Sequence, residues 1–247
     1  LLRQNFPDTL IKLTTNGTKL TPEKVELLAK AEPIELNVSL NSASAAGRKK
    51  LMKNPAETSL TGIKRLKEHG IIYHGSIVAM PQTVGWSDIE QTIAYLDQHG
   101  AQTIRVFLPG YTRFSPDETK FSLSLWDQLE EFVSRMQDQY KTPITLEPPR
   151  VKELTAQIEG VIAGFPAAEV GLQPKDEIIE INQESVFSRV DAFNRLLKSK
   201  APQVKVKRQT DEKLVTLNKK MGAKSGIVVD YDVDPSLLLK INRIINS

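Results

Sequence analysis

Polar and apolar side chains alternate strictly in the segment IELNVSLNS, residues 34–42, and polar groups at this spacing can act together on a bound ligand. Positions 34, 36, 38 and 40 are apolar, whereas the intervening residues are Glu35, Asn37, Ser39 and Asn41. Successive side chains of a β-strand point to opposite faces. The segment therefore predicts a strand with one apolar face and one face of hydrogen-bonding groups.

The same alternation recurs in four further segments within the first 147 residues. Their polar positions are Lys12 and Thr14, His74 and Ser76, Arg105, and Thr145 and Glu147. Parallel strands are normally buried on both faces and consist of nearly continuous apolar runs. Polar faces on five successive strands therefore predict an interior that holds water, a cofactor or a polar substrate. An open sheet with one face in water is the alternative.

Five strands and the helices between them must position these groups. The expected strands are residues 9–15, 34–41, 71–79, 103–108 and 143–147. Helical patterns lie between them, with ordinary start and stop signals such as Thr21 before Pro22 and the terminal Gly70 and Gly100. This alternation predicts βαβ units with parallel strands. Because five strands do not close the usual eight-stranded barrel, we expect a partial α/β (βα) barrel.

The pattern changes at Glu147-Pro148-Pro149, because a proline pair cannot continue a strand ladder. Short strand-like segments and one helix, RVDAFNRLLKS, follow and predict a small mostly-β domain. We therefore expect domains at residues 1–149 and 150–220. Residues 221–247 contain a strand-like SGIVVDYDVD and a helical PSLLLKINRIINS. They are either an edge element or the start of a further domain.

Composition excludes several functions. The net charge of +3 over 247 residues is too small to indicate nucleic-acid binding, and no apolar run approaches the roughly 20 residues of a membrane span. The chain has no cysteine, which excludes thiolate chemistry and is typical of a reducing compartment, so we expect a cytoplasmic protein. His69 and His99 precede helix-ending glycines, and Asp230, Asp232 and Asp234 lack the Gly and Glu of a calcium loop. We expect no metal site.

The second domain resembles a bacterial-type PDZ domain over about residues 153–220. The resemblance rests on the order of motifs in GVIAGFPAAEVGLQPKDEIIEINQESV. In two departures, Lys175 stands where a Gly is usual, and no Gly-Φ-Gly-Φ carboxylate-binding loop precedes the first strand. PDZ domains bind extended peptides by strand addition. The resemblance therefore implies a peptide groove bordered by Glu159, Gly160, Val161 and Ile162. A PDZ domain that docks only within its own chain is the alternative.

The first domain resembles the C-terminal part of a radical SAM barrel of the iron–sulfur oxidoreductase type, over about residues 9–147. The resemblance rests on TTNGT, ELNVSLNS, HGSIVAMPQTVGW and TIRVFLPGYT, in this order. It implies that S-adenosylmethionine is bound by a Thr-Asn-Gly strand end, by polar residues of the next strand and by the backbone of the strand after it. These residues are Thr15, Asn16, Ser39, Asn41, Gly75, Ser76 and Ile77. His74 and Arg105 are expected to face the substrate or the cofactor carboxylate.

The Cys-x3-Cys-x2-Cys loop that holds the [4Fe–4S] cluster in this family is absent, and so is the glycine-rich strand motif that binds the methionyl amine. Both normally precede the Thr-Asn-Gly segment. We therefore expect residues 1–247 to be part of a longer radical SAM oxidoreductase, and to be inactive alone. A degenerate homologue without a cluster is one alternative. A noncatalytic PDZ adaptor on an α/β scaffold, which acts through protein partners, is the other.

Overall fold

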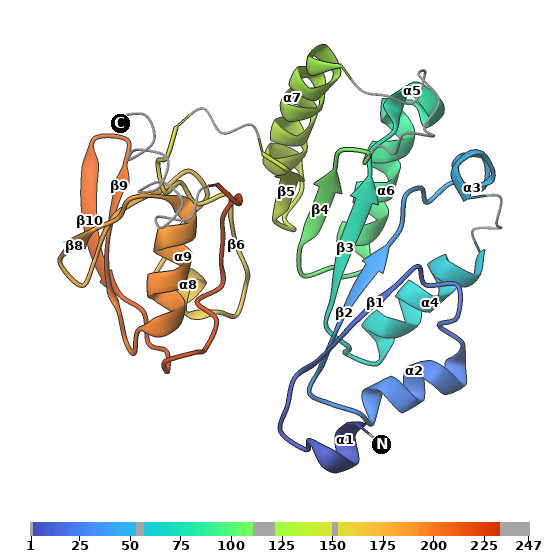
Figure 1. Ribbon diagram of the computed structural model, residues 1–247, viewed down its shortest axis with the longest axis horizontal. Helices are drawn as coiled ribbons and strands as arrows, with labels where there is room; N and C mark the ends of the chain where they lie inside the picture. Colours follow the sequence, from blue (N-terminus) through green and yellow to red (C-terminus); the bar gives the residue numbers. More distant parts are fainter. Residues whose placement is uncertain (1, 53–56, 111–121, 150–152, 233–247) are drawn as a thin grey trace, which may run out of the picture. The chain divides into compact units, whose positions relative to one another are not determined.

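The structure is a computed structural model, and it describes residues 2–52, 57–110, 122–149 and 153–232 (Figure 1). The chain divides into two compact units, Leu1–Leu146 and Glu147–Ser247. No helix in the described ranges has both the length and the hydropathy that a membrane span needs. The domain boundaries expected after residues 149 and 220 stay predictions.

A five-stranded sheet is the centre of the first unit. Its strands lie in the order β1-β2-β3-β4-β5, with the first four paired in parallel. They are β1 (Ile11–Thr15), β2 (Ile34–Ser39), β3 (Tyr73–Val78), β4 (Ile104–Phe107) and β5 (Ile144–Glu147). Each strand is followed in sequence by its spatial neighbour, which confirms the expected partial α/β barrel with parallel strands.

Seven helices connect or flank these strands in the described part of the first unit. They are α1 (Leu2–Asn5), α2 (Pro22–Ala29), α3 (Ala45–Met52), α4 (Glu57–Glu68), α5 (Pro81–Val84), α6 (Trp86–Gln98) and α7 (Leu123–Gln139). One apolar cluster joins the inward residues of the strands to α2, α4, α6 and α7. In β3, for example, Tyr73, Gly75 and Ile77 are buried while His74 and Ser76 are only half-buried. The alternation in the sequence thus separates a helix-covered face from a polar face.

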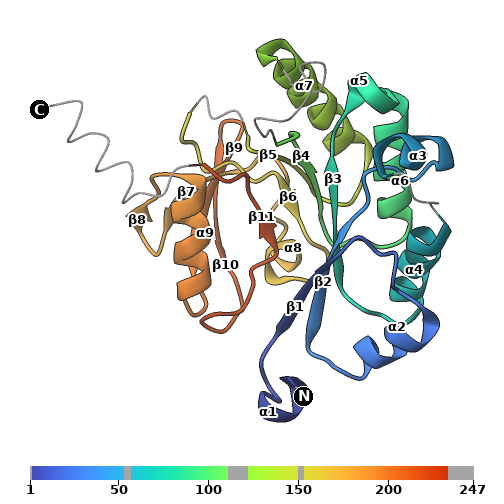
Figure 2. The same cartoon turned by 45° about the vertical axis from the view of Figure 1, so that its right-hand side comes forward.

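The second unit holds two small antiparallel sheets (Figure 2). The larger has the order β10-β9-β7-β8, and the smaller pairs β11 with β6. The strands are β6 (Gly160–Val161), β7 (Glu177–Ile181), β8 (Glu184–Ser185), β9 (Gln203–Arg208), β10 (Asp211–Thr216) and β11 (Ile227–Val228); the helices are α8 (Pro166–Glu169) and α9 (Arg189–Lys198). This arrangement confirms the expected small mostly-β domain.

The segment at 227–228 is part of this second unit, since β11 pairs with β6. The sequence left open whether it was an edge element or the start of another domain, and the pairing favours an edge element. The helix expected at PSLLLKINRIINS lies outside the described residues.

Lys175 occupies a backbone position that suits glycine. Its φ is 72°, in the left-handed region, and its side chain is exposed. In this conformation a non-glycine residue destabilises the fold by about 1 kcal/mol. Glycine avoids that strain, but part of the gain is offset because glycine has more conformational entropy in the unfolded state. We expect Lys175→Gly to stabilise the second unit by about 0.5 kcal/mol. Slower exchange of the Ile178 amide, which donates to the Ala156 carbonyl, would show it. Lys175→Ala is the control and should give no gain; a less stable glycine variant would refute the argument.

Candidate functional site

The neighbouring strands β2, β3 and β4 bring polar side chains together on the face that the helices do not cover. Register pairs Ser39 of β2 with Ser76 of β3, and Ser76 with Arg105 of β4. One layer deeper, Asn37 lies beside His74. Parallel neighbours end at the same edge of a sheet, so these rows form a polar surface that spans three strands.

Ser39, Ser76 and Asn41 form the centre of this surface. The hydroxyl oxygens of Ser39 and Ser76 lie 3.1 Å apart, and both residues are half-buried. Asn41 follows β2, and its Oδ1 accepts a hydrogen bond of 3.0 Å from the backbone N–H of Val78. Among the described residues, the amide NH2 of Asn41 has no hydrogen-bond partner, so it can donate to a ligand. We name Ser39, Asn41 and Ser76 the carboxyl-edge cluster.

Thr15 and Asn16 make a turn at the end of β1. Thr15 Oγ1 accepts from the Gly17 N–H at 3.1 Å, and Asn16 Oδ1 accepts from the Thr18 N–H and hydroxyl at 3.1 and 2.7 Å. Gly17 has a φ of 77°, which glycine adopts without strain. The side-chain oxygens of Thr15 and Asn16 thus hold the turn itself.

Gly75 and Ile77 have their Cα substituents on the opposite side, toward α6. A Cβ on Gly75 would lie 2.7 Å from Leu96 Cδ1, and Ile77 is fully buried. The Gly75 N–H donates to the Thr103 carbonyl at 2.8 Å, and the Ser76 carbonyl accepts from the Leu40 N–H at 2.9 Å. These backbone groups are therefore hydrogen-bonded within the sheet. A ligand that contacts this strand would meet its other groups.

His74 lies deeper on the polar face, beside Glu35. Its Nδ1 is 2.8 Å from Thr103 Oγ1 and its Nε2 is 4.0 Å from Glu35 Oε2. Lys12 Nζ lies 3.6 Å from the same carboxylate, which is 9% exposed. The Arg105 guanidinium stacks over the Phe107 ring, 5.1 Å from its centroid. His74 and Arg105 thus share the polar face with the carboxyl-edge cluster, as the strand alternation predicts.

A hydrogen-bonded network that the sequence did not reveal fixes the loop after Asn41. Asp88, on α6, accepts from the hydroxyls of Ser42, at 3.0 Å, and of Ser44. Ser44 Oγ also accepts from the Gly47 N–H at 2.9 Å, which caps α3. Thr92 Oγ1 accepts from the Ala43 N–H at 2.9 Å. The one local signal was Ser44, a good N-cap residue just before a helical segment.

Arg48 supports the turn at Asn16 from within the fold. It is fully buried, and its Nη2 donates to Ser59 Oγ at 3.1 Å. Ser59 in turn donates to the Asn16 carbonyl at 3.0 Å. No described residue accepts a hydrogen bond from Arg48 Nε or Nη1, and burial lowers the pKa of this guanidinium.

In the second unit, β11 lies along four residues of the neighbouring strand segment, Glu159, Gly160, Val161 and Ile162. The Glu159 N–H donates to the Val228 carbonyl at 2.9 Å, and the Ile162 N–H donates to the Gly226 carbonyl at 2.8 Å. The edge of this strand that faces β11 is therefore already paired within the chain.

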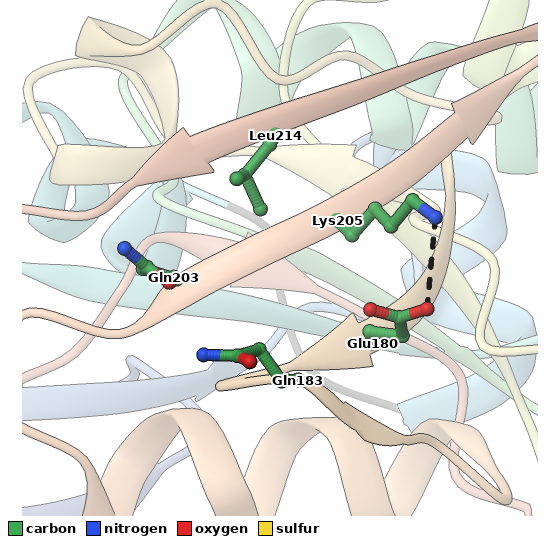
Figure 3. Close-up of a pocket in the computed structure, with 5 residues that line it drawn as sticks. All are labelled: Glu180, Gln183, Gln203, Lys205 and Leu214. Atoms are coloured by element: carbon green, nitrogen blue, oxygen red, sulfur yellow. Dashed lines mark ion pairs between the residues drawn. The ribbon is translucent and has the colours of Figure 1, made fainter.

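A shallow pocket of about 410 Å³ lies on the larger sheet of the second unit, lined by Glu180, Gln183, Gln203, Lys205 and Leu214 (Figure 3). The Lys205 ammonium pairs with Glu180 Oε1 at 3.6 Å and with Glu212 Oε2 at 2.7 Å. Because its one cation already has two carboxylates, the pocket offers little to a charged ligand.

The two cofactors of radical SAM enzymes fit this chain differently. S-adenosylmethionine needs several hydrogen-bonding groups at a half-buried edge, and the carboxyl-edge cluster supplies hydroxyls and an amide. A [4Fe–4S] cluster needs thiolates, and the sequence has no cysteine. No group of three His, Asp or Glu side chains suited to a metal occurs among the described residues. The donor set fits S-adenosylmethionine and does not fit the cluster.

Comparison with known protein families gives two matches. Residues 1–96 match the Radical SAM superfamily, and residues 157–208 match the PDZ domain. The comparison with curated proteins gives no match. 

Several solved structures are similar to part of this chain. Streptococcus suis SuiB bound to S-adenosylmethionine is 20% identical, with a TM-score of 0.45 over 55% of this chain and 30% of that chain. SuiB bound to its precursor peptide SuiA is 20% identical, with a TM-score of 0.46 over 55% of this chain and 31% of that chain. A domain of pyruvate-formate lyase-activating enzyme from Bacteroides vulgatus is 16% identical, with a TM-score of 0.43 over 56% and 79%. The chain thus spans less than a third of the length of SuiB.

The two family matches fall on the same two regions as the motifs read from the sequence. The TTNGT and ELNVSLNS segments lie within residues 1–96, and the GVIAGFPAAEVGL segment lies within residues 157–208. The resemblances are confirmed: the chain carries a radical SAM superfamily segment followed by a PDZ domain.

Proposed function

We propose that this chain is the S-adenosylmethionine-binding and docking part of a radical SAM oxidoreductase. The observation that carries the proposal is the carboxyl-edge cluster, which lies inside the segment that matches the superfamily. With a reduced [4Fe–4S] cluster, S-adenosylmethionine supplies radical chemistry. Residues 1–247 contain no thiolate for that cluster, so we propose that they are inactive alone. The absence of cysteine also supports a cytoplasmic location.

Each residue has a proposed role toward the cofactor. The hydroxyls of Ser39 and Ser76 and the amide of Asn41 hydrogen-bond the polar parts of S-adenosylmethionine. The adenine packs against the backbone of residues 75–77, while the Gly75 N–H and the Ser76 carbonyl keep their hydrogen bonds within the sheet. Thr15 and Asn16 shape the edge of the pocket through the turn that they hold. His74 and Arg105 lie on the same face, where they bind polar groups of a substrate or the carboxylate of the cofactor.

The PDZ domain has a proposed docking role. A peptide strand would add along the edge of β11 opposite residues 159–162, because the near edge is paired with those residues. Residues 159–162 would then border the groove from behind β11. A peptide from a protein partner or from the parent protein itself would fit this mode.

S-adenosylmethionine binding by this chain tests the proposal. In equilibrium dialysis with radiolabelled S-adenosylmethionine, we expect Ser39→Ala and Ser76→Ala each to weaken binding about fivefold, the value of one hydrogen bond of about 1 kcal/mol. Ser124→Ala, on the exposed side of α7, is the matched control and should bind like the wild type.

A second assay examines catalysis. After anaerobic incubation with iron, sulfide and reductant, the chain should release no 5′-deoxyadenosine from S-adenosylmethionine. Failure of this chain to bind S-adenosylmethionine would contradict the proposal. It would favour the alternative of a noncatalytic PDZ adaptor on an α/β scaffold.

A further inference from the structure

Five lysines and no Asp or Glu occur in two segments of the second unit, residues 196–202 and 217–224. The first segment holds the end of α9 and the turn after it, and the second is the loop between β10 and β11. Backbone hydrogen bonds join the two segments. The Gly222 N–H donates to the Leu197 carbonyl at 2.8 Å, and the Ala201 N–H donates to the Lys219 carbonyl at 2.9 Å. The lysines of both segments therefore lie at the C-terminal end of α9.

Lys219 has a structural role at this end of the helix. It is 7% exposed, and its Nζ donates to the Leu196 and Ser199 carbonyls at 2.7 and 2.8 Å. The last carbonyls of a helix lack intrahelical donors and carry the negative end of the helix dipole, so a cation stabilises them. The ammonium of Lys219 is that cation. The fold does not need the other four lysines for this purpose.

The other four lysines of the two segments are exposed. We name them the lysine patch: Lys198, Lys200, Lys220 and Lys224. Within the described residues, the ammonium groups of Lys198, Lys200 and Lys220 form no ion pair. Exposed groups of one sign that lie close together create a local potential that attracts ligands of the opposite sign. The lysine patch is therefore suited to an anionic partner.

Other cations of the second unit differ from the lysine patch, because carboxylates lie beside them. Lys205 Nζ is 2.7 Å from Glu212 Oε2, and Arg208 Nε is 2.6 Å from Asp176 Oδ1. Both pairs join strands or turns of the larger sheet, so these cations act within the fold. The contrast indicates that positive charge at the end of α9 is available to a partner.

The composition of the two segments, all of whose residues are described, favours an acidic peptide over other anionic partners. Single-stranded nucleic acid is bound by aromatic side chains that stack on its bases, and the segments contain no aromatic residue. A membrane surface requires a broad apolar face beside the cations. Met221, which is 72% exposed, is the one large apolar side chain that the segments expose. The carboxylates of a peptide require only exposed ammonium groups.

The lysine patch also adjoins the strand that is proposed to receive a peptide. Lys224 precedes Ile227, the first residue of β11, by three positions, which is at most about 10 Å along the chain. Among the described residues, no strand pairs with the edge of β11 opposite residues 159–162. A peptide strand on that edge would bring its flanking residues to the lysine patch.

We propose that the lysine patch selects acidic peptides for the second unit, by pairing with Asp or Glu side chains that flank the residues added to β11. The inference rests on the proposed docking function and names the chemical class of its ligand. Exposed ion pairs are individually weak and are screened by salt. The selection therefore depends on several pairs acting together, and it should fade at high ionic strength.

Selection from a phage-displayed library of random heptapeptides tests the proposal on the full chain. We expect the peptides selected by the wild type to be enriched in Asp and Glu. Synthetic copies with Asn and Gln in their place should bind about tenfold more weakly at about 50 mM salt. Near 0.5 M salt the difference should shrink to about twofold, because the charges are then screened.

A double variant, Lys198→Gln with Lys220→Gln, assigns the selectivity to the lysine patch. It should bind the selected acidic peptides about fivefold more weakly than the wild type and the Asn and Gln copies equally well. Lys24→Gln with Lys64→Gln is the matched control, because it removes two exposed lysines of the first unit and lowers the net charge equally. It should bind both sets of peptides like the wild type. Protection of the Ile178 amide shows that each variant is folded.

Selected peptides without an excess of Asp and Glu would overturn the proposal and leave the docking function intact. A double variant that binds acidic peptides like the wild type would do the same. If no peptide is selected, the docking function itself fails, and this inference fails with it. Cosedimentation with phosphatidylcholine–phosphatidylserine vesicles examines the other anionic surface. Vesicle binding that the double variant loses, without selection of acidic peptides, would assign the lysine patch to lipid and overturn the proposal.

Discussion

Gly226→Ala is expected to destabilise the second unit by roughly 3 kcal/mol, the largest effect of any single substitution considered for this chain. Gly226 has a φ of 86°, which an L-residue adopts at a cost of about 1–2 kcal/mol. A Cβ there would lie 2.2 Å from Phe165 Cβ. Because the position of a Cβ is fixed by the backbone, no change of side-chain rotamer can relieve this contact. Overpacking of this kind adds about 1–3 kcal/mol. The strain falls on Gly226, which precedes β11 and whose carbonyl accepts from the Ile162 N–H.

Gly164→Ala separates the two causes. Gly164 has a φ of 78°, close to that of Gly226, but a Cβ at this position would meet no atom within 4 Å. We expect Gly164→Ala to cost only about 1 kcal/mol, the conformational part. Exchange of the Ile178 and Val206 amides gives the stability of the second unit, while tryptophan fluorescence, from Trp86 and Trp126, reports only the first unit. Equal losses in the two variants would show that the close approach to Phe165 contributes nothing.

The polar face of the first unit could be predicted because it depends on local rules. Strict alternation in 34–41 assigns Ser39 and Asn41 to one side of a strand, whatever the strand packs against. The strand–helix–strand order then makes each strand the neighbour of the next, so Ser39 and Ser76 come together. Neither step requires knowledge of a distant side chain.

The contacts that could not be predicted are those that depend on how elements pack. Asp88 reaches Ser42 across 46 positions only because α6 lies beside the start of α3. The pairing of β11 with β6 joins residues 227–228 to 160–161, with no repeat or spacing to indicate it. Asp232 has the same character: nothing in its spacing of two from Asp230 indicates that its side chain is fully buried at the start of α9. Tertiary packing alone determines its partner.

Gly47→Ala is expected to destabilise the first unit by about 2 kcal/mol, although alanine is the better helix former by about 1 kcal/mol. A Cβ on Gly47 would lie 2.2 Å from Ser42 Oγ and 2.6 Å from Asp88 Oδ1. The methyl group must therefore displace a buried carboxylate from its serine partners, and a buried polar group without its partner costs about 1–3 kcal/mol. A lower urea midpoint, followed by tryptophan fluorescence, would show the loss.

Gly110→Ala is the control, because a Cβ there would meet no atom within 4 Å. Its urea midpoint should match that of the wild type. The comparison also bears on the site, since the Ser42–Asp88 contact fixes the loop that follows Asn41. If Gly47→Ala retains the wild-type free energy of unfolding, the hydrogen bonds between Asp88 and the serines can rearrange without loss of stability. They then cannot be what holds Asn41 in place. If it is destabilised and also binds S-adenosylmethionine more weakly under conditions where it remains folded, the network positions the carboxyl-edge cluster from the opposite side of β2.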